Sequence, residues 1–171
     1  SGSTSHSGTA PYGPVVAALR GRLRSDPGAL RGCGPLASHL AVILPELGEA
    51  AAVTDRPTLF EAIRCALAHV SRDRVVLMVL DDLHWSDEAT LELLSALAEP
   101  LGDLSVLVLA TYRSDGLARD HGLRRLRHEL RRARRLDELV LGPLEHDDVA
   151  QLLAASLDGP PSPSLVRSVH D

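Results

Sequence analysis

Residues 75–82 read Val-Val-Leu-Met-Val-Leu-Asp-Asp, and this stretch decides the fold class. Six consecutive apolar residues, half of them valine, are typical of a strand that is buried on both faces of a parallel sheet. A second run of this kind, Ser-Val-Leu-Val-Leu-Ala, occupies residues 105–110. We also expect a short third strand at residues 138–141, where the sequence is Glu-Leu-Val-Leu.

Helices are expected before, between and after these strands. Apolar residues at helical spacing predict them at residues 14–23, 35–44, 57–70, 86–97, 123–134 and 147–157, and from residue 163 onward. Ser86 is a candidate N-cap, and Thr58 with Glu61 forms a candidate capping box. Strands that alternate with helices predict an α/β fold with a mainly parallel sheet.

Composition limits the class of protein. The chain has 171 residues, the size of one ordinary domain, and its 44% apolar and 24% charged residues exclude a disordered or fibrous chain. Its longest apolar run is far shorter than the roughly 20 residues of a membrane-spanning helix. No N-terminal stretch resembles a signal peptide, so we expect a cytoplasmic protein without membrane partners. Cys33 and Cys65 are expected to be reduced thiols in apolar surroundings.

The basic residues are all of one type. All 18 are arginine, and the chain has no lysine. This excludes Schiff-base chemistry, the phosphate-binding lysine of a P-loop and the lysine of a phospho-acceptor receiver domain within this chain. The formal net charge of −5 argues against nucleic acid as the main partner of the domain.

Polar clusters follow both predicted strands, where open α/β sheets bind their ligands. An apolar run that ends in Asp81-Asp82 is the Walker B pattern, in which Asp81 would hold Mg²⁺ through water and Asp82 would orient an attacking water. The alternative is that the pair only ends a strand and begins a turn. Arg113 follows the second strand and could reach a γ-phosphate, although a surface ion pair is the simpler interpretation.

A longer motif surrounds the acidic pair. Residues 80–91, Leu-Asp-Asp-Leu-His-Trp-Ser-Asp-Glu-Ala-Thr-Leu, resemble the Walker B segment of STAND-type AAA ATPase domains. Such domains occur in large LuxR-type transcriptional regulators and beside adenylate cyclases and kinases. Further similar segments lie at residues 10–14, 44–47, 110–115 and 141–144, so that the resemblance covers residues 11–171.

The resemblance implies a fold and a set of roles. The fold would be a P-loop NTPase-like parallel sheet flanked by helices, with a partial nucleotide-binding domain at residues 1–142 and the start of a helical subdomain at residues 143–171. ATP and Mg²⁺ would be the cofactors of the intact domain. Asp81 and Thr111 would bind the cofactor, with Mg²⁺ on Asp81, and Asp82 and Arg113 would be catalytic.

The chain also departs from the family pattern. It has no Gly-Lys-Thr or Gly-Lys-Ser loop, and in the family the P-loop and its strand precede the segment where this chain starts. We therefore expect an incomplete domain that lacks the P-loop strand, is less stable than the intact domain, self-associates and does not hydrolyse ATP alone.

The expected function is that of a part of an ATP switch in a large signalling or transcriptional regulator. Its partners would be other domains of the regulator or a second copy of the chain, with DNA contacted only by a domain outside this chain. The alternative is a non-catalytic interaction module that keeps the ATPase fold.

An arginine-rich segment gives that alternative a candidate surface. Residues 119–135 contain eight arginines and two acidic residues, a local charge of +6. Leucines at helical spacing place the arginines on the outer faces of a helix, which favours a solvated surface. An acidic partner or another subunit is the second interpretation, and nucleic acid is a weaker one because interleaved aromatic residues are missing. Trp85 is expected to pack at the corner between strand and helix, and the eight histidines have no zinc-site spacing.

Overall fold

The computed structural model describes residues 11–114, 117–157 and 159–170. It divides into two compact units, with the boundary between Asp137 and Glu138. The α-helices are α1 (Gly13–Ser25), α2 (Ala37–Leu40), α3 (Arg56–Val70), α4 (Glu88–Ala98), α5 (Gly122–Arg132), α6 (His146–Ser156) and α7 (Pro163–His170). Short 3₁₀ helices are η1 (Arg31–Leu36), η2 (Pro45–Leu47), η3 (Leu83–Trp85) and η4 (Pro100–Asp103).

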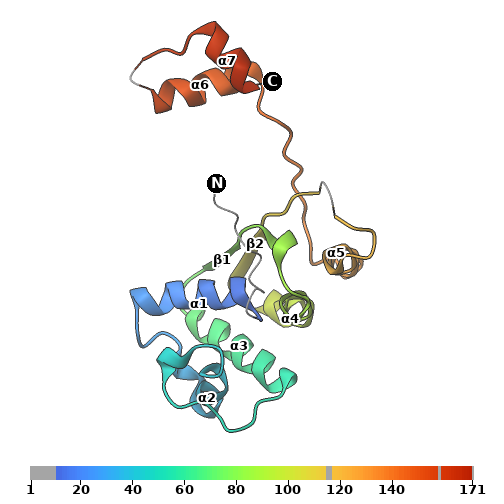
Figure 1. Cartoon of the computed structure of the whole chain (residues 1–171). Coiled ribbons are helices and arrows are strands. Elements are labelled where there is room, and N and C mark those ends of the chain that lie inside the picture. The colour runs from blue at the N-terminus through green and yellow to red at the C-terminus, as the bar shows by residue number, and fades with distance from the viewer. Residues whose placement is uncertain (1–10, 115–116, 158, 171) are drawn as a thin grey trace, which may run out of the picture. The chain divides into compact units, whose positions relative to one another are not determined.

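A small parallel sheet lies in the first unit. Strands β1 (Val76–Leu80) and β2 (Val106–Ala110) pair in parallel, in a register that runs from Val76 opposite Val106 to Leu80 opposite Ala110. Helices flank this pair, as Figure 1 shows. The expected α/β class is therefore confirmed, and the arrangement is consistent with part of a P-loop NTPase-like fold.

The hydrophobic core lies on one face of the sheet. Met78 and Leu80 are buried there together with residues of α1, α3 and α4, and the core includes the fully buried Leu30, Leu40, Leu44, Ile63, Leu93, Leu97 and Leu123. Leu77 and Leu107, which face each other across the ladder on the opposite face, are 56% and 60% exposed. The expectation that both faces are buried is wrong for the described residues. A run of apolar residues shows that a strand is hydrophobic, but it does not show whether other elements pack on one face of the sheet or on both.

The expected third strand is also wrong. Residues 138–141 have no strand structure, and Leu139, Val140 and Leu141 are almost fully exposed. A strand forms only when its backbone finds a neighbouring edge, and among the described residues none pairs with this segment. The apolar residues indicate a propensity for strand structure, but a strand also needs a neighbouring strand to pair with, which the local sequence does not show.

The starts of α3 and α4 are set by aspartates rather than by the expected caps. Asp87 Oδ1 accepts a hydrogen bond from the Thr90 amide at 2.9 Å, so the cap of α4 lies one residue after Ser86. At α3, Asp55 Oδ1 accepts a hydrogen bond from the Thr58 amide, also at 2.9 Å. Each carboxylate satisfies one of the free amides of a first helical turn.

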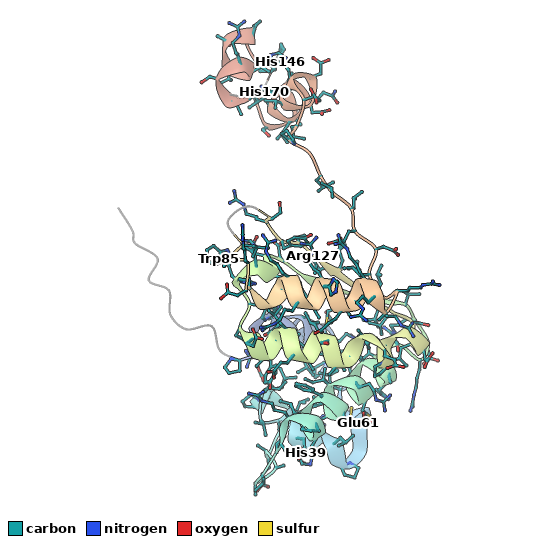
Figure 2. The ribbon with its side chains drawn as sticks, turned by 90° about the vertical axis from the view of Figure 1, so that its right-hand side faces the viewer. His39, Glu61, Trp85, Arg127, His146 and His170 are labelled. Atoms are coloured by element: carbon teal, nitrogen blue, oxygen red, sulfur yellow. The ribbon has the colours of Figure 1, made fainter. Side chains whose placement is uncertain are left out.

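The second unit is a pair of helices. Helices α6 and α7 pack together and bury Val149 and Val166. The rings of His146 and His170, labelled in Figure 2, have centroids 5.9 Å apart. No helix in the described parts of the chain is both long enough and apolar enough to cross a membrane.

Candidate functional site

The parallel register brings the two polar clusters to one edge of the sheet. Leu80 lies opposite Ala110, so Asp81 and Asp82 leave β1 beside Thr111, which leaves β2. Backbone hydrogen bonds continue past the strands, from the Thr111 amide to the Leu80 carbonyl at 3.0 Å and from the Leu83 amide to the Thr111 carbonyl at 2.8 Å. Three of the residues singled out in the sequence therefore lie side by side.

The Thr111 hydroxyl connects the two acidic residues. Its Oγ1 donates a hydrogen bond to Asp81 Oδ1 and accepts one from the Asp82 amide at 3.0 Å. The hydroxyl proton is thus directed at the Asp81 carboxylate, and a lone pair of the same oxygen fixes the backbone of Asp82. The first side chain after β2 therefore holds both residues that follow β1.

Asp82 lies at a sharp turn. Its backbone has φ 53° and ψ 43°, in the left-handed region, which costs a non-glycine residue about 1–2 kcal/mol. Aspartate is one of the few residues that visit this region routinely. The turn leaves the Asp82 side chain 62% exposed, so its carboxylate is open to water.

His84 links the acidic loop to the segment after β2. Its Nδ1 accepts a hydrogen bond from the Arg113 amide at 3.3 Å and lies 3.7 Å from Asp82 Oδ1. The His84 side chain is only 9% exposed. Sequence reasoning missed its role as a connector, and the only signal for it was its position two residues after Asp82.

Of the two neighbouring aromatic residues, Trp85 lies at the surface and Tyr112 is half-buried against the core. Trp85 is 64% exposed, so the expectation that it packs at the strand-to-helix corner is wrong. Its ring lies against His84, with centroids 5.0 Å apart, and Figure 2 shows it at the edge of the first unit. Arg127 of α5 has its Cζ 4.8 Å from the centre of the Tyr112 ring, a cation–π contact.

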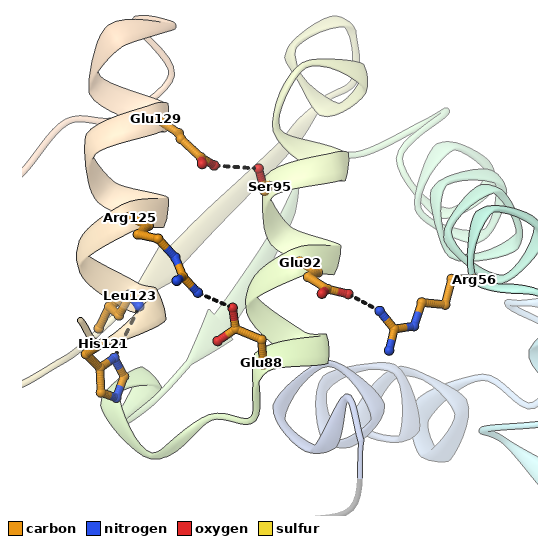
Figure 3. Close-up of polar contacts among 8 residues, drawn as sticks. All are labelled: Arg56, Glu88, Glu92, Ser95, His121, Leu123, Arg125 and Glu129. Atoms are coloured by element: carbon orange, nitrogen blue, oxygen red, sulfur yellow. Dashed lines mark hydrogen bonds and ion pairs between the residues drawn. The ribbon is translucent and has the colours of Figure 1, made fainter.

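The arginine-rich segment corresponds to α5, which lies along α4. Arg125 pairs with Glu88, and Ser95 Oγ donates to Glu129 at 3.0 Å, as Figure 3 shows. Leu123 and Leu126 are buried beneath these polar contacts. Part of the arginine surface is therefore used within the fold, and part of it faces solvent.

The donor set suits a hydrated hard cation. Asp81 and Asp82 are both exposed at the end of the sheet, and carboxylate oxygens are the ligands that Mg²⁺ prefers. In the described ranges no group of three or more His, Cys, Asp or Glu residues could enclose a metal ion. A cation at Asp81 would keep most of its water ligands.

Comparison with known proteins identifies a family that matches the chain. The family model described as "AAA ATPase domain" matches residues 2–109, more than half of the chain. The matched region contains β1 and Asp81-Asp82, whereas Thr111 and Arg113 lie just beyond it. No curated protein and no solved structure matches the chain.

Proposed function

The chain belongs to the AAA ATPase domain family, and we propose that it supplies the magnesium-binding and water-positioning part of an ATP-binding switch module. Members of this family generally bind ATP with Mg²⁺. One observation carries the proposal for this chain: the Thr111 hydroxyl bonds both Asp81 and the Asp82 backbone at the carboxyl ends of two parallel strands. A pair that only ended a strand would not need this connection.

The residues divide the work. Asp81 would hold Mg²⁺ through water, and Mg²⁺, when bound, supplies positive charge to the phosphate oxygens. The exposed carboxylate of Asp82 accepts a hydrogen bond from a water and orients it toward the γ-phosphate. Thr111 holds Asp81 and the backbone of Asp82 in position through its hydroxyl and would contribute to binding of the nucleotide. Arg113 offers a planar guanidinium to the γ-phosphate oxygens, and His84 holds its backbone.

The phosphates need a further element that we place outside this chain. Backbone amides and a lysine make up most of a P-loop's affinity for phosphate, and this chain contains no lysine. We propose that residues 1–142 are a partial nucleotide-binding domain and that residues 143–171 begin a helical subdomain. The division of the structure between Asp137 and Glu138 supports a border in this region.

We further propose that the module is of the STAND type and belongs to a large LuxR-type or related signalling regulator. The Asp-Asp-Leu-His-Trp run at residues 81–85 supports this assignment. ATP binding and slow hydrolysis would change the assembly state of the regulator in the cytoplasm. Its partners would be a second copy or other domains of the regulator, and DNA would be bound only by a domain outside this chain.

A second candidate function is a non-catalytic interaction module. It is favoured by the exposed apolar face around Leu77 and Leu107 and by the solvent-facing arginines of α5. This candidate predicts that neither acidic residue affects nucleotide binding.

The test separates the roles of Asp81 and Asp82 in an N-terminally extended chain that includes a P-loop. Asp81→Ala should weaken Mg²⁺-ATP binding, whereas Asp82→Asn should lower phosphate release at least tenfold and leave binding nearly intact. Asp73→Asn is the matched control, because Asp73 is exposed and precedes the other end of β1. If Asp82→Asn lost binding as severely as Asp81→Ala, the division of roles would be wrong; if neither variant differed from Asp73→Asn, the interaction module would be favoured.

A further inference from the structure

The chain's two cysteines lie on two elements that pack on each other, η1 and α3. Cys33 lies in η1 and is buried in the core, and Cys65 lies in α3, half-buried, and packs against the same core. The two elements that carry them pack directly on each other. Both residues are free thiols.

The close approach of η1 to α3 determines which residues of the two elements lie opposite each other. A Cβ at Gly32 would overlap the imidazole of His69, so the η1 backbone contacts α3 with no side chain of its own between them. His69 lies one helical turn after Cys65, on the same face of α3. Gly32 therefore faces His69, and its neighbour Cys33 faces the preceding turn, which carries Cys65.

The chemistry of Cys33 reflects this position. Burial, and after it the adjacent Cys65 thiol, raise the pKa of Cys33 to about 12. The Cys33 thiol therefore stays protonated at neutral pH, which agrees with the reduced pair expected from the sequence.

We propose that Cys33 and Cys65 form a reversible intrachain disulfide when the protein meets a peroxide, and that this bond fastens η1 to α3. The site is separate from the acidic pair, and nothing in its chemistry depends on a nucleotide. The disulfide would close a loop that contains α2 and η2, the elements between the two cysteines.

The reaction balances with peroxide as the oxidant. The Cys65 thiol, which is the more accessible one, gives up its proton as its sulfur attacks a peroxide oxygen; the O–O bond breaks, a sulfenic acid forms, and the departing hydroxide takes up that proton as the first water. The Cys33 sulfur then attacks the Cys65 sulfur; the S–S bond forms, the S–O bond breaks, and a second water leaves with the Cys33 proton. Two thiols lose two electrons, and one peroxide becomes two waters. A reducing thiol reverses the change.

Titration of the reduced chain with hydrogen peroxide tests the proposal. After denaturing alkylation with N-ethylmaleimide, intact mass should show that neither cysteine carries the maleimide and that the chain has lost two hydrogens. Dithiothreitol should reverse both changes. A non-reducing peptide map should contain one cross-linked pair, Cys33 with Cys65. The oxidised chain should melt roughly 5–10 °C above the reduced one, because the cross-link restricts the unfolded state.

Two variants serve as controls. Cys65→Ser should leave Cys33 fully alkylated after peroxide, and Cys33→Ala should stop at a sulfenic acid on Cys65 that dimedone traps. Neither variant should gain melting temperature on oxidation. The proposal is overturned if the wild-type chain keeps both thiols alkylatable in excess peroxide, gives disulfides only between chains, or accumulates sulfinic acid at Cys65 without a cross-link.

Discussion

At the scale of single residues, the Thr111 hydroxyl is the connection on which the acidic site depends. It is the only side chain in the described residues shown bonded to both Asp81 and the Asp82 amide. Because Asp82 has a left-handed backbone, its amide is held in place by this bond rather than by the regular strand ladder. The orientation of both carboxylates should therefore respond to changes at Thr111.

Replacing Thr111 with valine tests this connection. Valine keeps the shape of threonine and removes the hydroxyl, so Thr111→Val should lower the free energy of unfolding by about 1–2 kcal/mol. Thr111→Ser, which keeps the hydroxyl, should recover most of the loss. Urea unfolding measures both variants. Equal stability of the valine and serine variants would contradict the role of the hydroxyl.

At the scale of elements, α4 follows the loop that begins with Asp81 and Asp82, and Asp87 is its N-cap. The Asp87 carboxylate accepts hydrogen bonds from the Thr90 amide and hydroxyl, at 2.9 Å and 2.6 Å. In contrast, the buried Ser86 hydroxyl has no hydrogen-bond partner within the described part of the chain. The two neighbouring residues therefore differ sharply in what they contribute to the helix start.

Substitution of these neighbours by alanine should show the difference. Asp87→Ala should cost about 1 kcal/mol of stability, because it removes the cap. Ser86→Ala should be close to neutral, since it removes a buried hydroxyl that has no bond to lose. Thermal or urea unfolding of the two variants provides the measurement. A larger loss for Ser86→Ala than for Asp87→Ala would restore Ser86 as the cap.

The limits of sequence reasoning are clearest among these elements. Both strands were predicted to within one residue, because continuous apolar runs between polar clusters are local signals. The caps were misplaced because Ser86 and Asp87 are both good N-cap residues, and the choice depends on the backbone geometry between η3 and α4. At the site, the strand ends predicted only that polar clusters follow both strands. The bond from Thr111 to Asp81 and the link from His84 to Arg113 depend on the conformation of the loops, which no local sequence pattern encodes.

At the scale of the whole molecule, an apolar face of the sheet is uncovered in the described structure. Leu77 and Leu107 lie side by side on it, and Val79 pairs with Leu109 in the next row. Contiguous exposed apolar side chains mark surfaces that associate. The sequence could predict the residues of this patch but not its exposure, which depends on what packs against the sheet.

Self-association of the chain should therefore depend on this face. The double variant Leu77→Thr, Leu107→Thr should shift the chain toward monomer in sedimentation velocity, because threonine keeps strand propensity and removes apolar area. The control is Leu139→Thr, Leu141→Thr, which changes two leucines of the second unit that are even more exposed, at 85% and 81%. An equal shift in both double variants would show that the sheet face is not the specific contact.

Titration of Mg²⁺-ATP by calorimetry tests most directly whether Asp81 belongs to a nucleotide site. A chain extended at its N-terminus to include a P-loop should bind saturably near micromolar concentration, about −8 kcal/mol, and Asp81→Ala should weaken that binding at least tenfold. The 171-residue chain should show no saturable binding in the same range, because its carboxylates repel phosphate and Arg113 supplies a single exposed cation. Micromolar binding by the 171-residue chain, or unchanged binding by the extended Asp81→Ala variant, would contradict the account.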